Sequence, residues 1–76
     1  NLEEVYSEIR QSKIDIEKAV KYAKNSYELG LLDLMYLLNA QEQLYAISIQ
    51  ENKILSDIYK NKIDLILSLG GDLEYQ

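Results

Sequence analysis

A single glycine, Gly30, separates two long segments that both carry helical periodicity. Glycine adopts positive φ at no steric cost, so it can end one helix and let the next begin within a few residues. The chain has no proline, which would cost about 3 kcal/mol inside a helix, so each segment can run without interruption. The sequence therefore predicts one sharp reversal of the chain at Gly30.

The first segment has an amphipathic pattern with spacings of three and four residues. One stripe contains Leu2, Val5, Ile9, Ser12, Ile16, Ala19, Ala23 and Ser26. A second stripe beside it contains Tyr6, Val20 and Tyr27, with Lys13 in register. Both stripes have the period of an α-helix and lack the strict alternation of a half-buried strand. We expect a helix over about residues 2–28.

The second segment is longer and also has two neighbouring stripes. One contains Leu37, Ala40, Leu44, Ile47, Glu51, Ile54, Ile58, Asn61, Leu65 and Ser68. The other contains Leu34, Leu38, Gln41, Tyr45, Ser48, Asn52, Leu55, Tyr59, Lys62, Ile66 and Leu69. Two adjacent stripes of heptad spacing indicate that this helix packs against a neighbour on each side.

The ends of this second helix are marked by residues with capping preferences. Asp33 is a suitable N-cap or first-turn residue, and Gly70-Gly71 is expected to end the helix. We therefore expect a tip turn over about 29–32, a helix over about 33–69 and a C-terminal tail over 70–76.

Two helices joined by so short a turn must run antiparallel, so the predicted fold is all-α, a coiled-coil-like helical hairpin. One internal seam would leave the second stripe of each helix exposed. We expect other helices to cover these stripes, either from a longer parent protein or from a second copy. The isolated chain is accordingly expected to self-associate into a helical bundle, most simply as an antiparallel dimer.

Composition argues against several classes of function. The chain carries 13 acidic and 8 basic residues, a net charge of −5, whereas nucleic-acid binding needs a basic face. Histidine and cysteine are absent, which removes the commonest general base, the commonest strong nucleophile and thiolate metal ligands. No phosphate-binding loop or EF-hand spacing occurs. We therefore expect no enzymatic activity, no cofactor, no metal site and no nucleic-acid partner.

Two motifs carry a family resemblance. The first begins with Tyr27 and Gly30 and continues with LLNAQ at residues 37–41; the second is LSLGG at residues 67–71. Their spacing over residues 22–71 resembles the C-terminal region of TolC-like outer-membrane efflux proteins. The chain starts at Asn1 without an apolar leader, and we interpret it as a piece of a longer protein.

The resemblance implies a fold and a function. In that family three chains form one conduit, in which a membrane β-barrel continues into a periplasmic α-barrel built of helical hairpins. This chain would be the last hairpin of such a homotrimer, a periplasmic segment of an outer-membrane protein used in efflux or type I secretion. It would line the conduit and dock a periplasmic adaptor (membrane fusion) protein at its tip, and through that adaptor it would serve an inner-membrane pump.

The resemblance also implies candidate site residues. The adaptor-binding tip would comprise Tyr27, Leu29, Gly30, Leu31, Leu32 and Asp33. Tyr36 and Asn39 would line the entrance, at positions where some members carry acidic residues. The latch partner of the tip tyrosine is basic in those members and is leucine here, at Leu32. The charged latch and the acidic ring of the family are thus not retained.

Each candidate also has a purely structural interpretation. Gly30 can be a helix cap alone, and the three leucines can form a clamp that closes the turn. Tyr36 can be a packed wall residue, and Asn39 can bond a neighbouring helix. The alternative function is a stand-alone hairpin that acts as a scaffold or oligomerisation module without a transport role.

Overall fold

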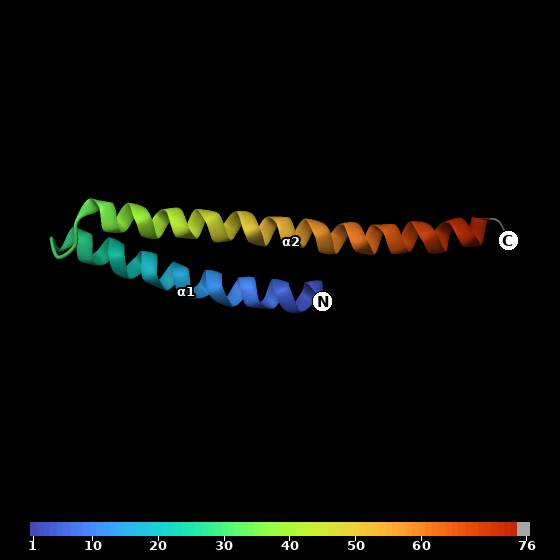
Figure 1. Cartoon of the computed structure of the whole chain (residues 1–76), viewed down its shortest axis with the longest axis horizontal. Helices are drawn as coiled ribbons and strands as arrows, with labels where there is room; N and C mark the ends of the chain where they lie inside the picture. The colour runs from blue at the N-terminus through green and yellow to red at the C-terminus, as the bar shows by residue number, and fades with distance from the viewer. Residues whose placement is uncertain (75–76) are drawn as a thin grey trace.

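The computed structural model describes the backbone of residues 1–74 and the side chains of residues 1–70. It consists of two antiparallel helices, α1 (Leu2–Glu28) and α2 (Leu34–Glu74), joined by a short turn. The helices lie side by side in a rod of 70 × 17 × 13 Å (Figure 1). The predicted all-α hairpin is therefore confirmed.

Side-chain caps define the N-terminal end of each helix. The Asn1 Oδ1 atom accepts a hydrogen bond of 2.8 Å from the backbone N–H of Glu4. Asp33 Oδ1 accepts one of 2.9 Å from the N–H of Tyr36. Each bond satisfies one of the amide groups that a helix leaves unpaired at its start. The expectation that Asp33 caps the second helix is confirmed.

The predicted end of the second helix is wrong. α2 continues through Gly70 and Gly71 to Glu74, so residues 70–74 are helical, and only 75–76 of the predicted tail lie outside the described residues. Glycine permits a helix to end but does not force it to, because its cost of about 1 kcal/mol in a helix can be tolerated. Gly70 does not have positive φ, and no other group lies where its side chain would be.

The interface between the helices is a single heptad seam. In α2 it follows the predicted first stripe from Leu37 to Ile58, whose members are buried or half-buried. In α1 the prediction is partly wrong, because Val5, Ser12 and Ala19 are exposed. The buried and half-buried residues of α1 are Leu2, Tyr6, Ile9, Lys13, Ile16, Val20, Ala23 and Ser26. The real seam therefore draws alternately on both predicted stripes.

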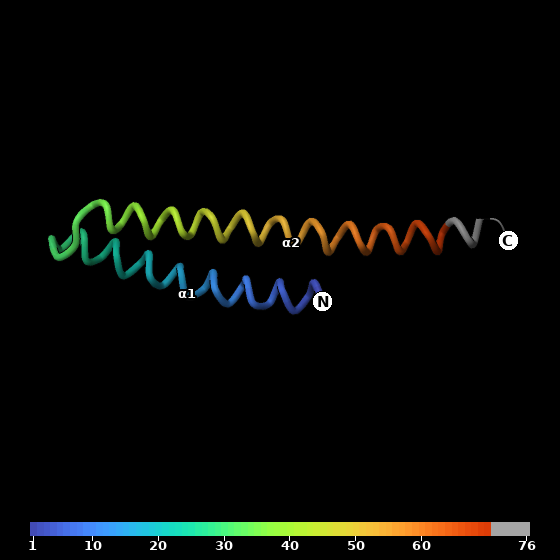
Figure 2. The backbone as a smooth tube through the Cα atoms, viewed as in Figure 1, coloured from blue at the N-terminus to red at the C-terminus, as the bar shows by residue number. Residues whose placement is uncertain are grey.

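The seam buries few side chains completely. The apolar residues with the lowest exposure are Ala23, Leu37, Ile54 and Ile58, at 0–9%. Beyond Ile58, every described side chain of α2 is exposed up to Gly70. Figure 2 shows why: α2 extends well past the first residues of α1. Within this part, Asn61, Lys62 and Leu65 still border a shallow groove with the start of α1.

The seam predicts unequal effects of shortening isoleucines. Ile54→Ala removes a side chain that is 9% exposed, and should lower the free energy of unfolding by about 2–4 kcal/mol. Ile14→Ala, at a position of α1 that is 37% exposed, should cost clearly less. Thermal and urea unfolding followed by circular dichroism measures the loss of stability in each variant. Equal losses would contradict the burial of Ile54 in the seam.

Candidate functional site

The tip turn is built by three backbone hydrogen bonds around Gly30. The N–H of Gly30 donates to the carbonyl of Tyr27 at 2.9 Å, and the N–H of Leu31 donates to the carbonyl of Ser26 at 2.8 Å. Leu29 closes α1 with a bond of 3.1 Å to Asn25. This is a Schellman cap, which requires a left-handed residue after the helix. Gly30 supplies it with φ of 78°.

The leucines of the tip are not equivalent. Leu29 and Leu31 are 75% and 72% exposed, so they project from the end of the rod and do not close the turn. Leu32 is half-buried. The turn therefore presents two apolar side chains to solvent, whereas the third is partly covered.

The other predicted tip residues have identifiable structural roles. Tyr27 is 39% exposed, and its carbonyl accepts the Gly30 hydrogen bond. Asp33 is exposed, but one of its oxygens caps α2. These residues and the leucines all lie within the same turn, so the six predicted tip residues are brought together.

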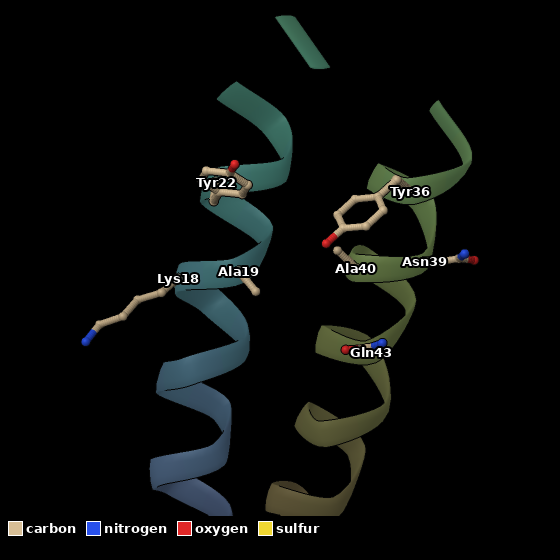
Figure 3. A pocket seen from close by; sticks show the side chains of 7 residues that line it. All are labelled: Lys18, Ala19, Tyr22, Tyr36, Asn39, Ala40 and Gln43. Atoms are coloured by element: carbon tan, nitrogen blue, oxygen red, sulfur yellow. The ribbon is translucent and has the colours of Figure 1, made fainter. Parts of the chain in front are cut away.

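The two predicted entrance residues border a groove near the tip. The groove has a volume of about 480 Å³ and is lined by Lys18, Ala19, Tyr22, Tyr36, Asn39, Ala40 and Gln43. In Figure 3, Ala19 and Ala40 face each other across the gap, and the Tyr36 ring points into it. Asn39 points away from α1, and Lys18 points away from α2. Tyr36 and Asn39 therefore face different surroundings, although both belong to the second helix.

Small residues form the floor of this groove, and side chains with polar ends form its rim. Ala19 and Ala40 leave space between the helices, whereas Tyr22 and Tyr36 are 67% and 55% exposed. Such a surface can receive an apolar side chain or another helix and offer hydroxyl and amide hydrogen bonds at its edges. It contains one charged residue, Lys18, whose side chain is directed outward.

A charged cluster in the middle of the seam was missed at the sequence level. Glu51 is 7% exposed and accepts hydrogen bonds from Lys13 Nζ at 2.9 Å and from Arg10 Nη1 at 3.0 Å. Lys13 and Glu51 each stood out as the charged member of an otherwise apolar or small-residue stripe. These two charged positions were the signal in the sequence for an ion pair across the seam, because a buried charge is tolerated where an opposite charge meets it.

The cluster shifts the ionisation of its members. The Lys13 ammonium, and then the Arg10 guanidinium, hold the pKa of the Glu51 carboxyl below its usual value, although burial acts in the opposite direction. The hydrogen bond to Glu51 also raises the pKa of Arg10. The hydrogen bonds therefore favour the charged forms of Glu51 and Arg10, and the charge of Glu51 within the seam is paired.

The described residues contain neither a membrane-spanning helix nor a metal-binding cluster. No stretch in residues 1–74 is long and apolar enough to cross a bilayer. No group of three or more acidic side chains is placed to hold a metal ion in this part of the chain.

Comparison with known proteins gives no relative. No protein-family model, no curated protein and no solved structure matches this chain. The resemblance to TolC-like proteins therefore rests on the residues of the two motifs alone.

The positive φ at the tip predicts opposite effects for one substitution at two glycines. Gly30→Ala should destabilise the hairpin by about 1–2 kcal/mol, because a Cβ atom is strained in the left-handed region. Gly70→Ala lies in a helix with free space around it and should raise helicity. Circular dichroism during thermal unfolding measures both variants. Similar changes in the two would contradict the Schellman turn.

The charged cluster predicts a pH dependence of stability. Because the pKa of Glu51 is lower in the folded chain, its contribution is present at neutral pH and is lost as the pH falls below its ordinary value of 4.5. Glu51→Gln should lower stability at neutral pH and flatten the acid limb of the stability profile. Glu8→Gln, an exposed control, should leave that limb in place. Identical profiles for the two variants would contradict this role of Glu51.

Proposed function

We propose that this chain is the last periplasmic hairpin of a TolC-like outer-membrane export channel. One observation carries the proposal: Gly30 of the Tyr-x-x-Gly motif forms the turn of a helical rod 70 Å long. The turn displays Leu29 and Leu31 at the end of that rod. A long hairpin with an apolar tip suits a part that spans a distance and makes contact at one end.

Adaptor docking would use the two exposed leucines. Monomeric proteins seldom leave neighbouring large apolar side chains fully exposed without a use for them. Leu29 and Leu31 lie on both sides of Gly30, which has no side chain to hold a partner at a distance. In the proposed assembly this tip contacts the helical hairpin of a periplasmic adaptor protein, which in turn serves an inner-membrane pump.

The wall of the conduit would be formed by the lateral surfaces of the hairpin. The groove at Ala19 and Ala40 permits a close approach of another helix. Six apolar residues of the second stripe of α2 are exposed: Leu34, Leu38, Tyr45, Tyr59, Ile66 and Leu69. In a homotrimer anchored in the outer membrane, neighbouring hairpins would cover these surfaces within the periplasm. Each hairpin would therefore contribute both wall and tip.

The proposed entrance would differ in its chemistry from charged versions of the family. Leu32 is half-buried and apolar, so it cannot act as the basic partner of Tyr27 in a latch. Tyr36 and Asn39 are uncharged where acidic residues would form a ring. Closure of this entrance would then depend on packing and neutral hydrogen bonds, without an acidic filter for cations.

A stand-alone scaffold hairpin is the alternative function. The observation that favours it is the set of exposed apolar residues in the second stripe of α2, which a second copy could cover without any channel. The two functions differ in the sequence expected upstream of Asn1. A channel requires a signal segment, transmembrane β-strands of about ten residues and an earlier hairpin with the same tip motif, whereas a scaffold requires none of these.

Adaptor docking predicts a selective loss of binding when the tip is altered. Leu31→Asp places a charge on a side chain that is 72% exposed, so it should preserve helicity and weaken binding of an adaptor hairpin by about tenfold or more. The probe is a purified helical hairpin from a periplasmic adaptor protein, and calorimetry measures its affinity.

A matched control is available at the other end of the rod. Leu67→Asp introduces the same change at a position of α2 that is 67% exposed, and should leave the affinity unchanged. Binding that is equal in the wild type and in Leu31→Asp, or that is lost equally in both variants, would reject docking through the tip.

A further inference from the structure

A basic segment of α1 lies next to the tip of a chain that is acidic as a whole. Residues 18–27 contain three lysines, Lys18, Lys21 and Lys24, and no acidic residue. Residues 34–41, at the start of α2, carry no charge. The complete chain has 13 acidic residues and 8 basic residues. The last part of α1 therefore forms a local region of positive charge beside the turn.

The three lysines have no acidic partner within the hairpin. All three side chains are exposed. The ion pairs among the described side chains lie elsewhere, at the start of α1 and around Glu51. Glu17 and Glu28 bound the basic segment, each four residues from a lysine, but neither forms an ion pair in the described part of the chain. The lysines are therefore available to an outside partner.

The helix dipole does not account for these lysines. Cations stabilise a helix mainly within its last turn, where the unpaired carbonyl groups concentrate negative charge. The last turn of α1 contains no basic residue, and it includes Glu28. The lysines thus lie before the region in which the dipole would favour them.

Two of the lysines share one face of α1 with exposed apolar residues. We call this surface the basic face. Leu29 has φ of −83° and ψ of −2°, in the right-handed helical region, so it continues this face into the tip. Lys18 points away from α2 in Figure 3, so it faces outward from the groove between the helices. The spacings of three and four residues define the basic face as Lys18, Lys21, Tyr22, Asn25 and Leu29.

The basic face has the properties of a surface that receives an acidic amphipathic helix. Tyr22 and Leu29 lie seven residues apart and are 67% and 75% exposed, so they can bury apolar side chains of a helix that packs lengthwise. The lysines beside them can meet carboxylates of the same helix. Opposite charges of this kind guide association and exclude partners of the wrong charge.

We propose that the adaptor helix that meets the tip also lies along the basic face of α1 and presents acidic residues to it. The contact runs from Lys18 to Leu29, about 16 Å along the helix axis. This inference rests on the proposed docking function and deepens it, because it specifies the charge of the partner and the helix that the partner contacts. The lysines fix the side from which the adaptor approaches, which the leucines of the tip alone do not determine.

Charge reversal tests the basic face. Lys18→Glu combined with Lys21→Glu should preserve helicity, because both side chains are exposed, and should raise the Kd for a purified adaptor hairpin roughly fivefold to twentyfold. Lys53→Glu combined with Lys60→Glu is the matched control, since it makes the same change of charge on exposed side chains of α2 far from the tip. Its Kd should stay close to that of the wild type. Circular dichroism measures helicity, and calorimetry measures each Kd.

Salt and the tip variant separate this inference from docking itself. Raising the salt concentration from about 0.05 M to about 0.5 M should weaken binding of the wild type more than binding of Lys18→Glu/Lys21→Glu. An unchanged Kd in that variant, or equal losses in both double variants, would overturn the basic face. Tip docking would still stand if Leu31→Asp alone weakened binding. No binding by the wild type would overturn both proposals.

A photoreactive side chain tests the position of the adaptor helix directly. Benzoylphenylalanine in place of Tyr22 should crosslink to the adaptor hairpin beside acidic residues, which peptide mapping identifies. The same replacement at Tyr59, which is 60% exposed, is the control and should give no crosslink. Crosslinks from Leu31 but none from Tyr22 would show contact at the tip only and overturn the contact along α1.

Discussion

The hairpin depends on one narrow seam, and the seam depends on the neutralisation of Glu51. A carboxylate at the centre of a helix interface would oppose packing if it lacked a partner, because burial favours its uncharged form. Lys13 and Arg10 of α1 both donate hydrogen bonds to this carboxylate, so the opposite helix compensates its charge. The apolar layer beside it, at Ile9 and Ile54, can then close without leaving an unpaired charge inside.

The sequence predicted the helices and the turn well because these are local properties. The period of the apolar residues, the cap at Asp33 and the glycine at position 30 each act within a few residues. The buried face of α1 was harder to predict, because the two stripes have the same helical period. The residues Leu2, Ile9 and Ile16 of the first stripe can form a seam with neighbours on either side of them. The choice between them is made by α2, whose Glu51 brings Lys13 into the seam.

The sequence was also a poor guide to two other features, the end of α2 and the separate roles of the tip residues. A glycine pair allows a helix to stop but does not force it to, and no neighbouring group lies within 4 Å of the place where a Gly70 side chain would be. At the tip, the sequence identified six neighbouring residues but could not separate their roles. The structure divides them: Gly30 and Asp33 shape the turn, Leu32 is half-buried, and Leu29 and Leu31 face solvent.

The part of α2 that extends past α1 creates a gradient of protection along the rod. Between Leu37 and Ile58 the amides of α2 are shielded by packing against α1, whereas residues 66–70 lie beyond the groove that α2 forms with the first residues of α1. Local opening therefore needs less free energy in the second region, and amide hydrogens should exchange with solvent faster there. A neighbour that packs along this region would slow that exchange, so exchange rates would reveal contact there.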